Sequence, residues 1–443
     1  MADPQYTHST PELLAAMQQA LGARDFSEAE RLAEIVSVRD PAQEDAVGFL
    51  VGLALAREDH FRALNVARGG VRAQPASARL QFQLGLALAA AGDHAAALQA
   101  FRRARARDPS LLAAPLWQAD CERALGRDDD ALRSQLQALD LAERSGLLAR
   151  ISTLAPPVRE RIERAVNDVQ HARRSAIEPA LASLHDAFGA TSIARIDRAL
   201  ARLYGDPAPE PMHPLQQPSL LFVPDLPDQA WFEREQFPFL ATLEAATDTI
   251  REELLGILAD EEGLVPYVDM PDSAPAAAMW GDLNHSPSWS GYHLYRHGER
   301  VEEHCARCPK TMALLESLPL MRIADHSPEI LFSVLKPRTH IPPHTGVING
   351  RLTVHLPLIV PENCGALRAG DEQRPWRVGE CLIFDDSFVH EAWNDSDQTR
   401  VVLILDAWNL HLTEPERSAL STAIADLGTF HRRYGGDDVT RES

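Results

Sequence analysis

A helical repeat runs through the first third of the chain, with a period of about 34 residues. Seven small or helix-ending residues recur at this interval: Ala29, Ala63, Ala97, Ala131, Pro41, Pro75 and Pro109. Because all seven stay in register, we expect one supersecondary unit to be repeated, with each copy packing on its neighbours. A plain helical bundle with a chance period is the alternative.

The third repeat is the clearest, ARLQFQLGLALAAAGDHAAALQAFRRARARDPS. It predicts a first helix through Gly85, a turn at Gly92, a second helix through Phe101 and an end at Pro109. Gly85 lets the paired helices approach closely, and Phe101 fills the space between units. A helix-turn-helix unit of this length is the tetratricopeptide pattern. Such arrays bind peptides or proteins, which is an expectation drawn from the fold alone.

Bulk composition excludes several classes of protein. The net charge of −21 argues against a nucleic-acid or anionic-membrane partner, since both need clustered positive charge. No apolar stretch approaches the roughly 20 residues of a membrane span, and the first residues lack a signal-peptide pattern. The five cysteines are sparse and odd in number, which disfavours a secreted disulfide scaffold. We therefore expect a cytoplasmic protein.

A chain of 443 residues is long enough for two or three domains. Apart from the repeats, the Pro-rich run 205–221 predicts an extended crossing, and 237–261 predicts one amphipathic helix outside a sheet. The expected order is tetratricopeptide-like repeats over 10–145, connecting or capping helices over 146–204, a β-rich domain over 205–430 and a tail over 431–443.

Residues 330–408 carry the strongest functional signal. Short β-branched and apolar runs alternate with Pro, Gly, Asn and Asp clusters, which predicts a small antiparallel barrel or sandwich. His344 and His390 each stand beside a turn at the end of such a run, where a side chain can face the mouth of a barrel. Neutral imidazoles in pairs suit iron, copper, zinc or nickel, although this pair by itself is a weak signal.

Alternation along two further runs adds to this pattern. In RLTVHLPLIV, Arg351, Thr353 and His355 share one face of the predicted strand and the other face is apolar. In TRVVLILDAW, Arg400 enters the barrel among apolar neighbours, which indicates a site for an anion such as a carboxylate. The alternative for Arg400 is an ion pair within the protein, with Asp385 or Asp386.

Other metal-binding residue types are given structural roles. Cys305 and Cys308 follow His304 and could bind zinc or form a redox couple, but no second CxxC follows, so a structural role is favoured. Six histidines are expected on the surface: His285, His297, His304, His326, His411 and His431.

Three segments resemble the aspartyl/asparaginyl β-hydroxylase family: PHTGVINGRLTVHLPLIVP, FDDSFVHEAWND and RVVLILDAW. Members are Fe(II)- and 2-oxoglutarate-dependent oxygenases built on a double-stranded β-helix, or jelly roll. The resemblance covers residues 215–415, and vertebrate members also carry tetratricopeptide repeats before the oxygenase domain. It therefore implies a helical repeat array followed by a jelly roll with flanking helices.

The resemblance also implies roles for individual residues. His344 and His390 are expected to ligate iron, with Arg400 and Ser333 gripping the distal carboxylate of 2-oxoglutarate. The residues expected to bind this cosubstrate are Trp289, Ser333, Arg351, His355 and Arg400. Most oxygenases of this class add a carboxylate to the two histidines. Here Gly346 stands two residues after His344, which matches the two-histidine site of this family.

One position departs from the vertebrate pattern. A second arginine is expected two residues before His355, and Thr353 stands there instead. Arg351 lies on the same face, roughly 6.6–6.8 Å further along the strand, and is the nearest replacement. It is expected to contact the cosubstrate or else the substrate.

The resemblance implies O2-dependent hydroxylation of an unactivated C–H bond with release of succinate and CO2. The expected substrate is the β-carbon of Asp or Asn in a peptide or protein engaged by the repeats. A small molecule or a lipid acyl chain is an alternative substrate. A non-catalytic peptide-binding scaffold is the alternative function, although the joint retention of the site residues argues against it.

Overall fold

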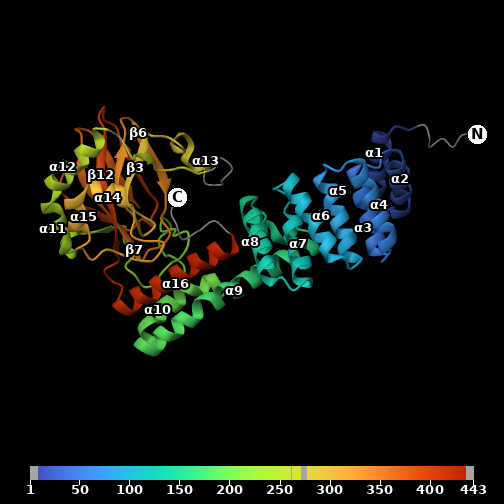
Figure 1. Cartoon of the computed structure of the whole chain (residues 1–443), viewed down its shortest axis with the longest axis horizontal. Helices are drawn as coiled ribbons and strands as arrows, with labels where there is room; N and C mark the ends of the chain where they lie inside the picture. Colours follow the sequence, from blue (N-terminus) through green and yellow to red (C-terminus); the bar gives the residue numbers. More distant parts are fainter. Residues whose placement is uncertain (1–7, 261, 271–276, 436–443) are drawn as a thin grey trace, which may run out of the picture. The chain divides into compact units, whose positions relative to one another are not determined.

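The computed structural model describes residues 8–260, 262–270 and 277–435, which form two compact units. The first unit extends to Val169 and is helical, whereas the second begins at Gln170 and contains two β-sheets with flanking helices (Figure 1). Each unit is described by itself below.

The first unit confirms the predicted repeats. Each of its helices packs on the next. They are α1 (Thr10–Gly22), α2 (Phe26–Arg39), α3 (Glu44–Ala56), α4 (His60–Ala73), α5 (Ala78–Ala90), α6 (His94–Arg107), α7 (Ala113–Ala124) and α8 (Asp128–Arg144). Asp25, Asp59 and Asp93 recur at the repeat interval, and each caps the next helix by accepting a backbone N–H three positions on. The period therefore fixes helix starts as well as packing.

Gly85 and Phe101 meet between α5 and α6, as their positions in the repeat predict. Phe101 is fully buried, and a Cβ at Gly85 would lie 2.6 Å from Cδ1 and 2.8 Å from Cζ of its ring. The absence of a side chain at residue 85 is what lets the ring lie against the helix.

We expect Gly85→Ala to destabilise the repeat array by about 1–3 kcal/mol, because the added methyl group overlaps the Phe101 ring. The free energy of unfolding in urea measures this. The control is Gly52→Ala on α3, where a Cβ meets nothing within 4 Å, so that helix propensity alone should stabilise the protein slightly. Equal unfolding midpoints for the two variants would contradict the packing described.

The α9 helix (Pro156–Phe188) begins at the Pro156–Pro157 pair in the first unit and continues past Gln170 into the second, where α10 (Ala190–Leu200) follows it. The second unit then forms two antiparallel sheets. The eight-stranded sheet has the order β1-β10-β7-β12-β5-β3-β2, with β4 paired to β3, and the four-stranded sheet has the order β6-β11-β8-β9. The strands are β1 (Trp231–Phe232), β2 (Val265–Pro266), β3 (Trp289–Arg296), β4 (Glu299–Arg300), β5 (Ile330–Leu335), β6 (Thr339–His344), β7 (Arg351–Ile359), β8 (Ala366–Ala369), β9 (Glu372–Pro375), β10 (Leu382–Phe384), β11 (His390–Asn394) and β12 (Arg400–Trp408).

From β5 to β12 the chain passes back and forth between the two sheets, which is the jelly-roll topology expected from the sequence. Inward-facing side chains of both sheets therefore share one interior. Strands far apart in the sequence become neighbours, since β12 pairs with both β5 and β7.

Helices cover the outer face of the larger sheet (Figure 1). Short helices α13 (Ala277–Trp280), α14 (Glu302–Arg307) and α15 (Pro309–Leu315) precede β5, and α16 (Glu414–Tyr434) follows β12. Leu240, Leu243 and Leu254 pack in one core cluster with Leu352 and Val354 of β7. Ile348 packs separately against Ala419, Leu420 and Ile424 of α16.

Three sequence predictions for this unit need correction. The single helix expected over 237–261 is two helices, α11 (Phe239–Ala245) and α12 (Thr247–Leu258). The buried Thr247 donates its hydroxyl to the Glu244 carbonyl at 2.6 Å. This side-chain hydrogen bond competes with the backbone hydrogen bonds of a continuous helix at the point where the two helices meet. His326 and His431, expected on the surface, are buried with 3% and 2% of their area exposed. Their neighbours in the folded chain come from distant segments that local sequence does not reveal.

The end of the chain is helical as far as Tyr434. Of the tail expected over 431–443, residues 436–443 lie outside the described residues. Among the residues that the structure describes, no helix is both long enough and apolar enough to cross a membrane.

Candidate active site

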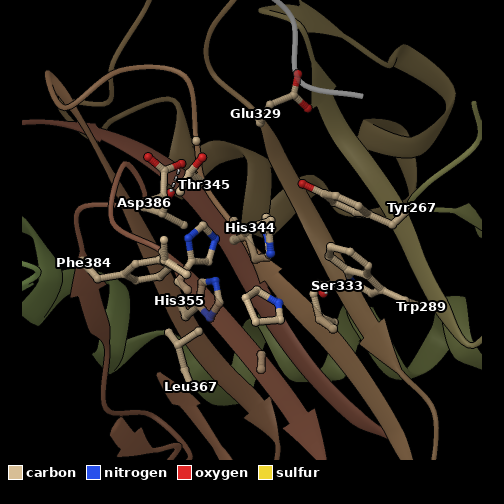
Figure 2. A pocket seen from close by; sticks show the side chains of 18 of the residues that line it. Tyr267, Trp289, Glu329, Ser333, His344, Thr345, His355, Leu367, Phe384 and Asp386 are labelled. Atoms are coloured by element: carbon tan, nitrogen blue, oxygen red, sulfur yellow. Dashed lines mark hydrogen bonds between the residues drawn. The ribbon is translucent and has the colours of Figure 1, made fainter. Parts of the chain in front are cut away.

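A cavity of about 620 Å³ lies between the two sheets. Six of the seven predicted site residues line it: Trp289, Ser333, His344, His355, His390 and Arg400. They come from β3, β5, β6, β7, β11 and β12, so the jelly roll gathers them from strands that are well separated in the sequence. Figure 2 shows these strands converging on the pocket.

The two predicted metal ligands face one another. His344 ends β6 and His390 begins β11, and the pairing of these strands places the two residues in register. Their ring centroids are 4.0 Å apart. In each ring Nδ1 lies 2.9 Å from the carbonyl oxygen two residues earlier, that of Pro342 or Phe388. These contacts assign the proton of each ring to Nδ1, so Nε2 is the nitrogen that can act as a metal ligand.

Burial keeps the imidazoles of the cavity neutral. It lowers the pKa of His390 to about 4 and, with the charge of Arg400, lowers the pKa of His355 to about 3. A neutral imidazole is the form that binds a metal ion. At neutral pH both rings are therefore in that form without any further change.

A carboxylate occupies the space beside Gly346. Gly346 follows His344 by two residues, and a Cβ built there would lie 2.5 Å from both carboxylate oxygens of Asp386. The Asp386 carbonyl also accepts the Gly346 N–H at 2.7 Å. The turn between β10 and β11 thus puts a carboxyl group in the space that a side chain at Gly346 would occupy.

Arg400 occupies a different part of the cavity as a buried cation. Only 1% of its area is exposed, and among the described residues its Nε and Nη1 have no hydrogen-bond partner. Its guanidinium lies 4.5 Å from the centre of the Trp376 ring. Burial lowers its pKa to about 10, so it stays charged at neutral pH. An unpaired buried guanidinium is costly and calls for an anionic ligand.

The ion pair considered for Arg400 forms elsewhere. Asp386 pairs with Arg351 and also accepts the Thr353 hydroxyl at 3.1 Å. Asp385 accepts the side-chain amide of Gln216 at 3.1 Å and the backbone N–H of Ser387 at 2.9 Å, and burial raises its pKa.

Ser333 and Trp289 stand close to Arg400 across the sheet. Trp289 donates its indole N–H to the Ser333 hydroxyl at 3.1 Å. Ser333 is in register with Val402, two residues along β12 from Arg400. These side chains form a polar end of the cavity around the buried arginine.

Arg351 does not line the cavity in this structure. It is fully buried, paired with Asp386, with its Nε 3.9 Å from Asp406. Its guanidinium contacts Asp386 and Asp406, which both line the cavity. Thr353, at the position where the vertebrate pattern has an arginine, donates its hydroxyl to Asp386.

Three other residues line the cavity but are not among those predicted from the sequence: Tyr267, Trp280 and Glu329. Tyr267 stacks on Trp289 with ring centroids 4.0 Å apart, and Trp280 lies 4.9 Å from the His344 ring. No local pattern marks these aromatic residues. Glu329 had a usable signal, since it stands four residues before Ser333 and so on the same strand face.

The two cysteines of the CxxC pair are free and buried. Cys305 donates its thiol to the Leu294 carbonyl at 3.2 Å. Within the described part of the chain, no group of three or more His, Cys, Asp or Glu side chains is arranged to hold a metal ion. The cavity holds the pair of histidines described above, His344 and His390.

Comparison with known proteins gives a family match for part of the chain. Residues 244–410 match the family model of the aspartyl/asparaginyl beta-hydroxylases. The match contains all six strands that contribute the predicted lining residues, so every one of those residues lies inside the matched region.

Curated relatives match part of the chain. The human aspartyl/asparaginyl beta-hydroxylase is 34% identical over 207 residues, which cover 46% of this chain and 26% of that protein. The ornithine lipid ester-linked acyl 2-hydroxylase of Rhizobium tropici is 33% identical over 177 residues, covering 40% of this chain and 59% of that protein. The chain thus spans less than two thirds of either relative.

Among solved structures, a crystal structure of MamA aligns with 31% of this chain and 81% of its own length. The sequence identity is 17% and the TM-score is 0.28.

Proposed function

We propose that this protein is an Fe(II)- and 2-oxoglutarate-dependent hydroxylase. The observation that carries the proposal is the buried guanidinium of Arg400, which shares one cavity with His344 and His390 and whose Nε and Nη1 lack hydrogen-bond partners among the described residues. A dicarboxylate would satisfy the guanidinium at one end and reach a metal ion at the other. The match of residues 244–410 to a hydroxylase family model supports the same interpretation.

In this proposal His344 and His390 hold the iron through Nε2. The bound iron, with 2-oxoglutarate and O2, supplies the oxidising chemistry for an unactivated C–H bond, with succinate and CO2 as coproducts. Arg400 and Ser333 bind the distal carboxylate of 2-oxoglutarate through charge-assisted hydrogen bonds. Trp289 and His355 complete this pocket and exclude water from it. We assign Arg351 the role of positioning Asp386, because those two side chains are paired.

The names of the relatives suggest the substrate: Asp or Asn in a peptide or protein, hydroxylated at the β-carbon. We propose that the repeat array engages this substrate, since stacked helical repeats present extended binding surfaces. We also propose a cytoplasmic location, which the five free, buried cysteines support.

The test is succinate formation by the purified full-length protein with Fe(II), 2-oxoglutarate and O2, measured with and without a metal chelator. We expect slow chelator-sensitive turnover even without substrate. Binding of 2-oxoglutarate with Mn(II) is measured separately as a rise in melting temperature. A protein that neither forms succinate nor is stabilised by 2-oxoglutarate is a scaffold and not this enzyme.

The crowding at Gly346 gives a further prediction. Gly346→Asp restores a carboxylate two residues after His344, yet its Cβ would lie 2.5 Å from both oxygens of Asp386. We expect a loss of about 1–3 kcal/mol of stability from the overlap and no gain in Mn(II) affinity. Thermal unfolding and Mn(II) titration measure both effects, and a fully stable single variant would contradict the geometry.

A further inference from the structure

The cavity has an acidic end as well as a cationic one. Glu329, Asp386 and Asp406 line it, whereas Arg400 is the one lysine or arginine among its described lining residues. The Asp406 carboxylate accepts the backbone N–H of Glu329 at 2.8 Å, so these two acidic residues are neighbours in the folded chain. Asp386 is paired with Arg351. The lining thus holds three carboxylates and one arginine.

The two ends are separated along the strands. Glu329, Leu331 and Ser333 alternate toward the cavity, and four residues of strand rise about 13 Å. Ser333 belongs to the end proposed for 2-oxoglutarate, so Glu329 lies at the opposite end. Figure 2 shows Glu329 and Tyr267 on the side of the pocket away from His355 and Leu367. A substrate that approaches the histidine pair from this side passes Glu329.

Glu329 is held in place as an anion. Its Oε1 lies 3.0 Å from Nδ1 of His297 and its Oε2 lies 3.6 Å from Nδ1 of His293. It also accepts the backbone N–H of His297. Burial by itself raises the pKa of Glu329, but the contacts with the His293 and His297 side chains and with the backbone N–H of His297 outweigh this effect and lower the pKa to about 2. The carboxylate is therefore ionised at neutral pH.

The surroundings of Glu329 favour a cation over an anion. Glu329 and Asp406 line this end of the cavity, and a carboxylate attracts an ammonium or guanidinium group. A substrate carboxylate at this end would instead meet Glu329 and Asp406, and like charges at close range are repulsive. The lining selects for positive charge next to the reacting carbon.

We propose that Glu329 binds the ammonium or guanidinium group of a lysine or arginine that flanks the hydroxylated residue of a peptide substrate. This inference rests on the proposed function, because it takes the Ser333 end of the cavity as the cosubstrate site. It makes Glu329 a specificity-determining residue for the substrate.

The experiment uses acetylated and amidated pentapeptides with a central asparagine. At each flanking position in turn they carry lysine, norleucine, which has a similar side chain without the ammonium, or glutamate. Their binding to the full-length protein loaded with Mn(II) and 2-oxoglutarate is measured by calorimetry. Succinate formation with Fe(II) is measured in parallel. The variants are Glu329→Gln, which keeps an acceptor oxygen for the His297 N–H, and the exposed Glu302→Gln as a control of equal charge change.

At one flanking position we expect the lysine peptide to bind at least about tenfold more tightly than the norleucine peptide, the scale of a charge-assisted hydrogen bond. Glu329→Gln should abolish this preference, and Glu302→Gln should keep it. Equal binding of the three peptide series, or an unchanged preference in Glu329→Gln, overturns the inference.

These outcomes separate the two proposals. Succinate formation without any charge preference retains the proposed function and rejects the Glu329 site. A Glu329-dependent lysine preference in a protein that forms no succinate retains the site and rejects the enzyme. Preference for the glutamate peptides also rejects the site, because it shows an anion bound where the lining is acidic.

Discussion

His344→Ala and His390→Ala should each abolish succinate formation, with a loss of at least about a thousandfold. Two side chains are the whole set of protein ligands proposed for the iron, so removal of either leaves a single imidazole. Each ring is fixed by a separate backbone carbonyl at 2.9 Å, so the remaining histidine cannot move to take the position of the one removed. Succinate formation at saturating Fe(II) measures the effect, and Mn(II) titration shows whether metal affinity is what is lost.

His285→Ala is the matched control, since this histidine of the same domain is half-exposed and pairs with Asp269. It should retain turnover near that of the natural protein. Far-ultraviolet circular dichroism should be the same for all three variants, because none of them alters the core packing of the sheets. Full turnover in His390→Ala would remove this pair from the mechanism.

Arg400→Met should change cosubstrate binding and stability in opposite directions. The guanidinium is buried, and its Nε and Nη1 lack hydrogen-bond partners among the described residues. Loss of one partner of a buried charge pair costs about 3–5 kcal/mol, so 2-oxoglutarate affinity should fall by roughly a hundredfold or more. Without 2-oxoglutarate, however, replacing an uncompensated buried charge by an apolar side chain should raise the melting temperature.

Thermal unfolding with and without 2-oxoglutarate and Mn(II) measures both parts of this prediction. The control is Arg338→Met, because Arg338 and its partner Asp397 are both exposed and surface ion pairs contribute little. It should change neither the melting temperature nor its rise on adding 2-oxoglutarate. A variant Arg400→Met that loses stability while keeping its response to 2-oxoglutarate would show that the arginine is structural.

Much of the architecture was predictable because it depends on local periodicity. The repeat period placed the paired helices, and alternation in RLTVHLPLIV placed Thr353 and His355 on one face, where both now line the cavity. The exception was the helix over 237–261. Its hydrophobic pattern continues through the break, and the interruption at Ala246 accompanies burial of Thr247, which follows from tertiary packing.

The residues proposed for metal and cosubstrate binding were also within reach of the sequence, since family motifs surround each of them. Glu329 and Asp386 were harder to assign. The role of Asp386 depends on a contact with Gly346, which belongs to a different turn of the chain. The role proposed for Glu329 depends on Asp406, which the pairing of β5 with β12 places beside it. Neither contact can be predicted from the periodicity of the sequence.

The sequence by itself determined the repeat array, the jelly roll and the strand faces on which the site residues lie, because helix and strand periods are local properties of the chain. Only the tertiary structure decided which charges meet. It paired Arg351 with Asp386 and left Arg400 as the buried cation of the cavity, because the order of strands in the sheets sets these distances.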